Sequence, residues 1–157
     1  MEAKFLRKKG MGMTDFDRKA GVLWTGDLKS GHGLISTESR ALFELPYDYQ
    51  TRFEDKEGLN PEELLAAAHA ACFCMAVAER VEENGYKPLQ TETTATCTVA
   101  SKNDGHEITK MRLHVRGEVP GIDEATFNKL VMEADKECPV SNVLRHGLNI
   151  EITTALI

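Results

Sequence analysis

The stretch that decides the fold is residues 60–85, which read NPEELLAAAHAACFCMAVAERVEENG. Asn60 is a favourable N-cap, and Pro61 suits the first position of a helix. Helix-forming residues then continue to Asn84, after which Gly85 supplies a stop signal. The pattern predicts a helix of about 24 residues, roughly 36 Å long.

The middle of this helix, residues 64–78, is apolar on every side. A helix without a polar face is buried all round. A chain of 157 residues can hardly surround such a helix alone, so we expect a partner chain to cover part of it. The same stretch, interrupted by His69, is too short and too rich in alanine to span a membrane. The charged N-terminus lacks the apolar region of a signal peptide.

The rest of the chain is predicted to form short strands and two further helices. The expected strands cover residues 21–24, 33–36, 41–45, 91–101, 111–116 and 148–154. Asp123 caps a second helix with apolar residues at helical spacing, and Cys138-Pro139 ends it and begins a short third helix. The order of strands, long helix, strands, helices and strand predicts an α+β fold with antiparallel sheet.

The length of the chain indicates the number of domains, and its net charge argues against one class of binding partner. The size suits one compact domain, which we place at residues 16–157, with residues 1–15 as a flexible extension. The formal net charge is −6, and the first nine residues hold four basic residues and one acidic residue, which leaves the remaining chain at −9. An acidic body repels phosphate backbones, which argues against nucleic-acid binding. We therefore expect a soluble, cytoplasmic protein.

Four cysteines, Cys72, Cys74, Cys97 and Cys138, are too few for a disulfide scaffold in a chain of this length. They must serve packing, metal binding or reactivity. Cys138 precedes Pro139 at a helix start, where free N–H groups favour a thiolate. Cys72 lies among alanines, and a small buried packing residue is the more common explanation for such a cysteine. Cys74 points about 200° around the helix from Cys72, and we assign it to packing. Cys97 lies in an alternating strand, where it would be a core residue or a solvent-facing filler.

Other polar residues give weaker signals. His69, three residues before Cys72, would suit a Cys–His pair or half of a metal site, although a lone histidine in an apolar helix is more often a hydrogen-bonded core residue. The chain has no CxxC motif, so a four-ligand zinc site is not expected. Helix capping explains Glu62, and Arg52 reads by default as a surface charge.

Two separated motifs nevertheless resemble the signature of a known family. Residues 60–75 and Cys138-Pro139-Val140-Ser141-Asn142-Val143-Leu144 are similar to the two cysteine motifs of the OsmC/Ohr family, the osmotically inducible protein C and organic hydroperoxide resistance proteins. Thr51-Arg52-Phe53-Glu54 resembles the OsmC branch more than the Ohr branch. The resemblance covers about residues 17–157.

The resemblance implies a thiol peroxidase acting on organic hydroperoxides and, less well, on hydrogen peroxide. It makes Cys72 the peroxidatic cysteine and Cys138 the resolving one, with Arg52 holding the thiolate and Glu62 orienting Arg52. The implied fold is an intertwined homodimer whose long central helices pack between antiparallel sheets. No metal or bound cofactor is implied; an external dithiol, lipoyl groups on proteins among them, would be the reductant. Cys74 stands where the family usually has serine.

Two other functions remain open from the residues themselves. One is a cysteine hydrolase using Cys72 with His69, although the sequence shows neither an oxyanion hole nor a third orienting group. The other is a non-enzymatic stress protein that binds hydrophobic ligands between its helices, with the cysteines as packing.

Overall fold

The computed structural model describes residues 15–103 and 105–157. The extension expected at residues 1–15 therefore lies outside the described residues, except for Asp15. The chain forms two compact units, Met1–Tyr49 and Gln50–Ile157. The single domain at residues 16–157 stays a prediction.

The first unit is a three-stranded antiparallel sheet in the order β1-β2-β3. Its strands are β1 (Ala20–Thr25), β2 (His32–Thr37) and β3 (Leu45–Asp48). The first two match the predicted strands, but the strand expected at residues 41–45 is wrong. Arg40 and Glu44 have positive φ angles of 62° and 50°, so the chain turns there and the strand begins only afterwards. Pro46 is tolerated because β3 is an edge strand.

The second unit contains the remaining helices and a second three-stranded sheet. Its elements are α1 (Tyr49–Phe53, which begins at the boundary), α2 (Pro61–Glu83), β4 (Gln90–Lys102), β5 (Gly105–Glu118), α3 (Glu124–Glu137), α4 (Pro139–Leu144) and β6 (Asn149–Leu156). The predicted α+β class and the helices α2, α3 and α4 are confirmed. Helix α1 was not predicted.

The sheet of the second unit is mixed, which corrects the expectation of antiparallel sheet throughout. β4 and β5 pair antiparallel, but β5 and β6 pair parallel. The helices α3 and α4 form the crossover that a parallel pair requires, because they return the chain to the end of the sheet where β5 began. The alternating pattern of residues 148–154 identifies a strand and does not reveal its direction.

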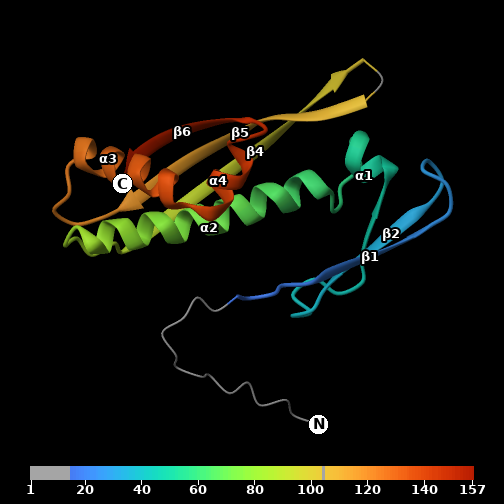
Figure 1. Cartoon of the computed structure of the whole chain (residues 1–157), viewed down its shortest axis with the longest axis horizontal. Helices are drawn as coiled ribbons and strands as arrows, with labels where there is room; N and C mark the ends of the chain where they lie inside the picture. The colour runs from blue at the N-terminus through green and yellow to red at the C-terminus, as the bar shows by residue number, and fades with distance from the viewer. Residues whose placement is uncertain (1–14, 104) are drawn as a thin grey trace, which may run out of the picture. The chain divides into compact units, whose positions relative to one another are not determined.

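Helix α2 lies along one face of the β4-β5-β6 sheet and packs against α3 and α4 (Figure 1). The sheet contributes the buried residues Met111, Leu113 and Val115, the inward set predicted from their alternation with charged residues. Phe73 and Val77 of α2 are fully buried against them in the same core. This packing fixes which side of α2 faces α4.

The opposite side of α2 is exposed in the single chain, contrary to the expectation of burial all round. Ala67, Ala68 and Ala71 are exposed, and Met75 is 75% exposed. By length and hydropathy alone α2 could cross a membrane. Its buried side packs in the core of the second unit, however, which is typical of the core helix of a globular protein.

Candidate active site

Cys72 lies in the middle of α2, and the start of this helix is fixed by the residues that the sequence indicates. The Asn60 Oδ1 atom accepts a 2.8 Å hydrogen bond from the Glu63 backbone N–H group. This bond satisfies one of the free N–H groups of the first helical turn. Pro61 is the first helical residue. With the start and the buried side of α2 both set, the half-buried Cys72 side chain packs against the core.

Cys138 approaches Cys72 from the junction of α3 and α4. Its side chain is 0% exposed. Cys138 is the C-cap residue of α3, where its N–H group donates to the Ala134 carbonyl at 2.8 Å, and it is also the N-cap residue of α4. The Cys138 thiol donates to the Cys72 sulfur at 3.5 Å. Both cysteines are free thiols. A disulfide needs about 2.05 Å between the sulfurs, so a small movement of α4 would join them.

The electrostatic surroundings of Cys72 work against its ionisation. Burial raises the pKa of the Cys72 thiol, and the neighbouring Cys138 raises it further. A hydrogen bond from the Val140 backbone N–H group lowers this pKa in part. The sequence predicts that the free N–H groups at the start of α4 favour a thiolate at Cys138. In the structure, one of these N–H groups, that of Val140, donates to Cys72 instead. Within the single chain, the net effect is a thiol that ionises less readily than an ordinary cysteine.

Arg52 and Glu62 form the second pair of residues. The Arg52 Nη2 atom lies 2.7 Å from Glu62 Oε1, and Nε lies 3.1 and 3.3 Å from the two carboxylate oxygens. The Glu62 side chain is 12% exposed and that of Arg52 is 38% exposed. The Arg52 guanidinium also lies over the Phe53 ring, 4.8 Å from its centroid. This geometry holds the guanidinium in one orientation.

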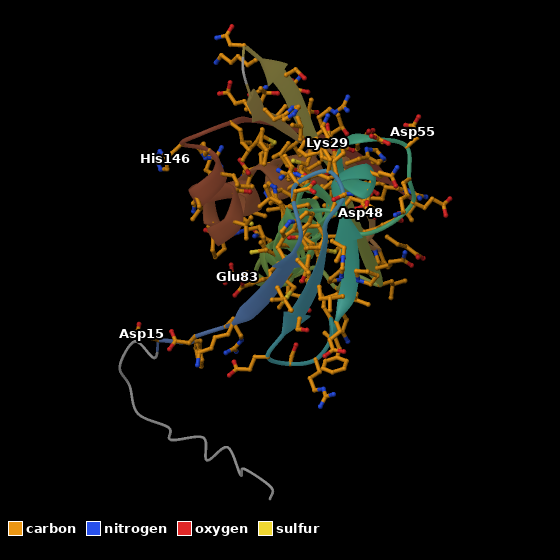
Figure 2. The ribbon with its side chains drawn as sticks, turned by 90° about the vertical axis from the view of Figure 1, so that its right-hand side faces the viewer. Asp15, Lys29, Asp48, Asp55, Glu83 and His146 are labelled. Carbon is orange, nitrogen blue, oxygen red and sulfur yellow. The ribbon has the colours of Figure 1, made fainter. Side chains whose placement is uncertain are left out.

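Cys72 lies beside Cys138, and Arg52 lies beside Glu62, but the two pairs are far from each other. Arg52 belongs to α1, and the loop that carries Asp55 joins α1 to α2 (Figure 2). Glu62 lies in the first turn of α2, ten residues before Cys72. Ten helical residues correspond to about 15 Å along the axis. In the single chain, the guanidinium that the resemblance assigns to the thiolate is therefore not beside it.

The other residues weighed in the sequence lie outside these pairs. His69 is 0% exposed and shares a 2.8 Å hydrogen bond with the Ser141 hydroxyl, rather than with Cys72. Cys74 contacts the carbonyl and hydroxyl oxygens of Thr91 at 3.2 and 3.3 Å. Cys97, on β4, is half-buried, and burial and the Glu62 charge raise its pKa. His69 is thus a hydrogen-bonded core residue, the reading that sequence statistics favour.

Sequence reasoning missed two side chains beside the cysteines. Ser141 is fully buried against His69, and Asp135 of α3 is 5% exposed and pairs with Arg145 at 2.8 Å. The available signal was spacing, because Ser141 follows Cys138 by three residues as His69 precedes Cys72 by three. Among residues 15–103 and 105–157, no group of three or more His, Cys, Asp or Glu side chains is arranged to hold a metal ion.

Comparison with known proteins identifies the family. Residues 54–153 match the model of the OsmC-like protein family. The chain belongs to this family. It is 43% identical over 134 residues to Peroxiredoxin OsmC of Escherichia coli, covering 85% of this chain and 94% of that one. It is also 32% identical over 100 residues to an organic hydroperoxide resistance protein of Xanthomonas axonopodis, covering 63% and 68% of the two chains.

The fold agrees with this membership. The crystal structure of an organic hydroperoxide resistance protein from Legionella pneumophila superposes with a TM-score of 0.71 at 22% identity, covering 89% of this chain and 97% of that one. The resemblance stated from the sequence is therefore confirmed. The matched region of this OsmC-like protein includes Cys72, Cys138 and Glu62, while Arg52 lies just ahead of it.

Proposed function

We propose that this OsmC-like protein is a thiol peroxidase that reduces organic hydroperoxides and, less efficiently, hydrogen peroxide in stress defence. The observation that carries the proposal is the 3.5 Å separation of the Cys72 and Cys138 sulfurs, both of them free thiols. The names of the relatives, Peroxiredoxin OsmC and organic hydroperoxide resistance protein, support the same chemistry.

The different burial of the two cysteines supports the different roles that we propose for them. Cys72 is half-buried and accessible to substrate, so its thiolate attacks the terminal oxygen of the hydroperoxide. The O–O bond breaks, Cys72 becomes a sulfenic acid, and the alkoxide leaves as the alcohol after taking up a proton. The fully buried Cys138 then attacks the sulfenic sulfur. A disulfide forms, and the sulfenic hydroxyl leaves as water with the Cys138 proton.

We propose that the Arg52 guanidinium supplies the positive charge that Cys72 lacks, and that this guanidinium, oriented by Glu62, comes from a second copy of the chain. Two α2 helices packed antiparallel about an axis level with Ala67 would put residue 62 of one copy at the height of residue 72 of the other. The exposed alanines on α2 permit a close approach of the two helices. Such an isologous interface creates two equivalent sites.

The same arrangement explains the exposed side of α2. The exposed residues Ala67, Ala68, Ala71 and Met75 would leave an apolar strip on a monomer. Such a surface is typical of an interface. A homodimer built on this strip would cover it and complete both sites together.

The remaining parts of the proposal concern the reductant and the compartment. A dithiol, with lipoyl groups on proteins as the candidates, reopens the disulfide by thiol exchange. No prosthetic group takes part in either step. The cycle requires Cys72 and Cys138 to return to thiols between turnovers, which suits the reducing cytoplasm.

The alternative functions have less support in the site. A hydrolase would need His69 beside Cys72, but its Nε2 atom is engaged by Ser141 and the imidazole is fully buried. A protein that only binds hydrophobic ligands would not need two thiols in contact, as Cys72 and Cys138 are.

A steady-state assay tests the function. Purified protein is supplied with dihydrolipoamide and either cumene hydroperoxide or hydrogen peroxide, and peroxide consumption is followed. We expect turnover with both substrates and a higher kcat/KM for cumene hydroperoxide. Cys72→Ser should abolish turnover, while Cys74→Ser, which removes the thiol facing Thr91, should retain it. Full activity in Cys72→Ser would contradict the proposal.

A further inference from the structure

A second polar contact between α2 and α4 runs parallel to the contact between the cysteines. The His69 Nε2 atom and the Ser141 hydroxyl oxygen are 2.8 Å apart, and both residues are 0% exposed. His69 precedes Cys72 by three residues, and Ser141 follows Cys138 by three. Each step is about 4.5 Å along its helix. The two helices are thus joined at two neighbouring points, one through sulfur and one through this hydrogen bond.

Electrostatic interactions link this contact between α2 and α4 to a third helix, α3. Asp135 pairs with Arg145, the residue that follows α4, at 2.8 Å, and the Asp135 carboxylate interacts electrostatically with His69. The His69 Nδ1 and Asp135 Oδ1 atoms are both buried, and neither has a hydrogen-bond partner in the described structure. The negative charge of Asp135 favours the proton on Nδ1, which leaves Nε2 to accept from Ser141. Breaking a buried hydrogen bond leaves its donor and acceptor without water to replace the lost partner, so the Ser141–His69 contact resists rearrangement.

Helix α4 is short, and its apolar residues Val140 and Leu144 are only partly buried against the core. It has six residues, and Cys138 at its start makes no side-chain capping hydrogen bond. Val143 on its outer side is 75% exposed. Its polar attachments are the Ser141–His69 bond, the Arg145–Asp135 ion pair and a bond from Asn142 to the Lys136 carbonyl. Among these side-chain contacts of the described residues, only the Ser141–His69 bond reaches α2; the Val140 backbone N–H group of α4 also donates to Cys72 itself.

We propose that Ser141 and His69, supported by Asp135, are positioning residues that set the distance between the two thiols. This inference rests on the proposed function, because it assigns a role in the resolving step. The bond keeps Cys138 within reach of oxidised Cys72, so that disulfide formation outruns further oxidation. Without it, α4 moves more freely, the effective concentration of one thiol near the other falls, and Cys72 advances to sulfinic acid.

Thiol–disulfide equilibrium tests the positioning role without requiring peroxidase activity. The wild type, Ser141→Ala, His69→Leu and His69→Gln are oxidised with diamide and equilibrated with mixtures of reduced and oxidised dithiothreitol. Alkylation and mass spectrometry then give the equilibrium constant of the Cys72–Cys138 disulfide. We expect Ser141→Ala and His69→Leu to lower this constant about tenfold, the effect of losing roughly one net hydrogen bond. His69→Gln should recover most of it, because its amide oxygen can accept the hydrogen bond from the Ser141 hydroxyl in place of Nε2.

Val131→Ala on α3 is the matched control, since Val131 is also 0% exposed but takes no part in the polar contact. It should lower the free energy of unfolding and leave the disulfide constant unchanged. The same variants are then treated with excess cumene hydroperoxide, and the ratio of Cys72 sulfinic acid to disulfide is measured. We expect that ratio to rise in Ser141→Ala and His69→Leu alone.

Two results would overturn the inference. One is an unchanged disulfide constant in both Ser141→Ala and His69→Leu. The other is an equal fall in Val131→Ala, which would reduce the effect to general loss of packing. If the wild type forms the disulfide with diamide but does not react with peroxide, the proposed function is wrong. The positioning role is then still decided by the disulfide equilibrium constants of the variants.

Discussion

The pKa of the Cys72 thiol is subject to opposing effects from its surroundings. Burial and the adjacent Cys138 raise the pKa of its thiol, and one backbone N–H group, from Val140, lowers it. A nucleophilic thiol at neutral pH needs a stronger positive influence than one N–H group. The Arg52 guanidinium, already oriented by Glu62, is the candidate that remains charged over the whole working range.

The first prediction at this scale separates the two oxidation steps. In Cys138→Ser, one equivalent of peroxide should still oxidise Cys72, but the sulfenic acid has no partner and dithiol-dependent turnover should fall at least about tenfold. Mass spectrometry should show added oxygen on Cys72 in this variant and a Cys72–Cys138 disulfide in the wild type. A Cys74–Cys138 disulfide in the wild type would contradict the assignment.

The second prediction concerns the charge that activates Cys72. Arg52→Ala should raise the pKa of the thiol and slow its reaction with iodoacetamide at pH 7 about tenfold to a hundredfold. Glu62→Gln should have a smaller effect, by leaving Arg52 less firmly oriented. His69→Asn should scarcely change the profile, because its imidazole faces Ser141. The measurement is the rate of alkylation between pH 6 and pH 10. A large shift in His69→Asn with none in Arg52→Ala would reverse the roles.

The sequence predicts the two cysteines but not what surrounds them. Each cysteine sits in a motif whose letters can be matched, so Cys72 and Cys138 can be named without a structure. That the Val140 N–H group faces Cys72, and that Ser141 contacts His69, depends on how α4 is turned against α2. This orientation is set by long-range packing, which leaves only a weak trace in local spacing.

At the scale of elements, local signals decide which predictions hold. Helix α2 begins where Asn60 and Pro61 indicate, because capping is a local property of the chain. The strand at residues 41–45 fails because two residues with positive φ turn the chain there. The parallel pairing of β6 cannot be predicted from alternation, since an alternating strand reads the same in either direction.

The third prediction concerns the packing of α2 against α4 and its dependence on pH. Burial is the main cause of the lowered pKa of His69, only partly opposed by the Asp135 charge. The unfolded chain takes up a proton near the ordinary value of about 6.5, whereas the folded chain resists it. Stability from this site is therefore complete above that pH and is lost as the pH falls toward the lowered pKa.

Urea unfolding at pH 8, 7, 6 and 5 measures this dependence. The free energy of unfolding of the wild type should fall below pH 6.5, and His69→Gln should remove part of that fall. His146→Gln is the control, because His146 is exposed after α4 (Figure 2) and its replacement should leave the slope unchanged. Equal slopes for the wild type and His69→Gln would show that His69 does not carry the effect.

At the scale of the whole molecule, a single chain leaves apolar surface on both of its units. In the first unit, Val22 and Leu23 of β1 are 57% and 63% exposed. In the second unit, Met75 of α2 is 75% exposed. Exposure of this extent on two separate elements favours an obligate homodimer. Sedimentation at micromolar concentration should give twice the mass of the chain, and a stable monomer would contradict the proposed dimer.

The last prediction tests whether each site is shared between two chains. As homodimers, Cys72→Ser is expected to be inactive and Arg52→Ala to keep only a small fraction of wild-type activity. If Arg52 acts on the partner's thiol, a heterodimer of the two has one site with both an intact thiol, from the Arg52→Ala chain, and an intact guanidinium, from the other. Refolding the two variants together at equal amounts should then recover about a quarter of wild-type activity, because half of the dimers are mixed and each has one working site.

A second mixture serves as the control, because Cys72 and Cys138 contact each other within one chain. Mixing Cys72→Ser with Cys138→Ser therefore leaves every site without one of its two thiols and should recover nothing beyond the residual turnover of Cys138→Ser. Recovery in the first mixture alone requires that the thiol pair is contributed by one chain and the charge by the other. Failure of the first mixture would instead place Arg52 on its own Cys72, and a movement of α1 by about 15 Å along α2 would then be needed to bring the two together.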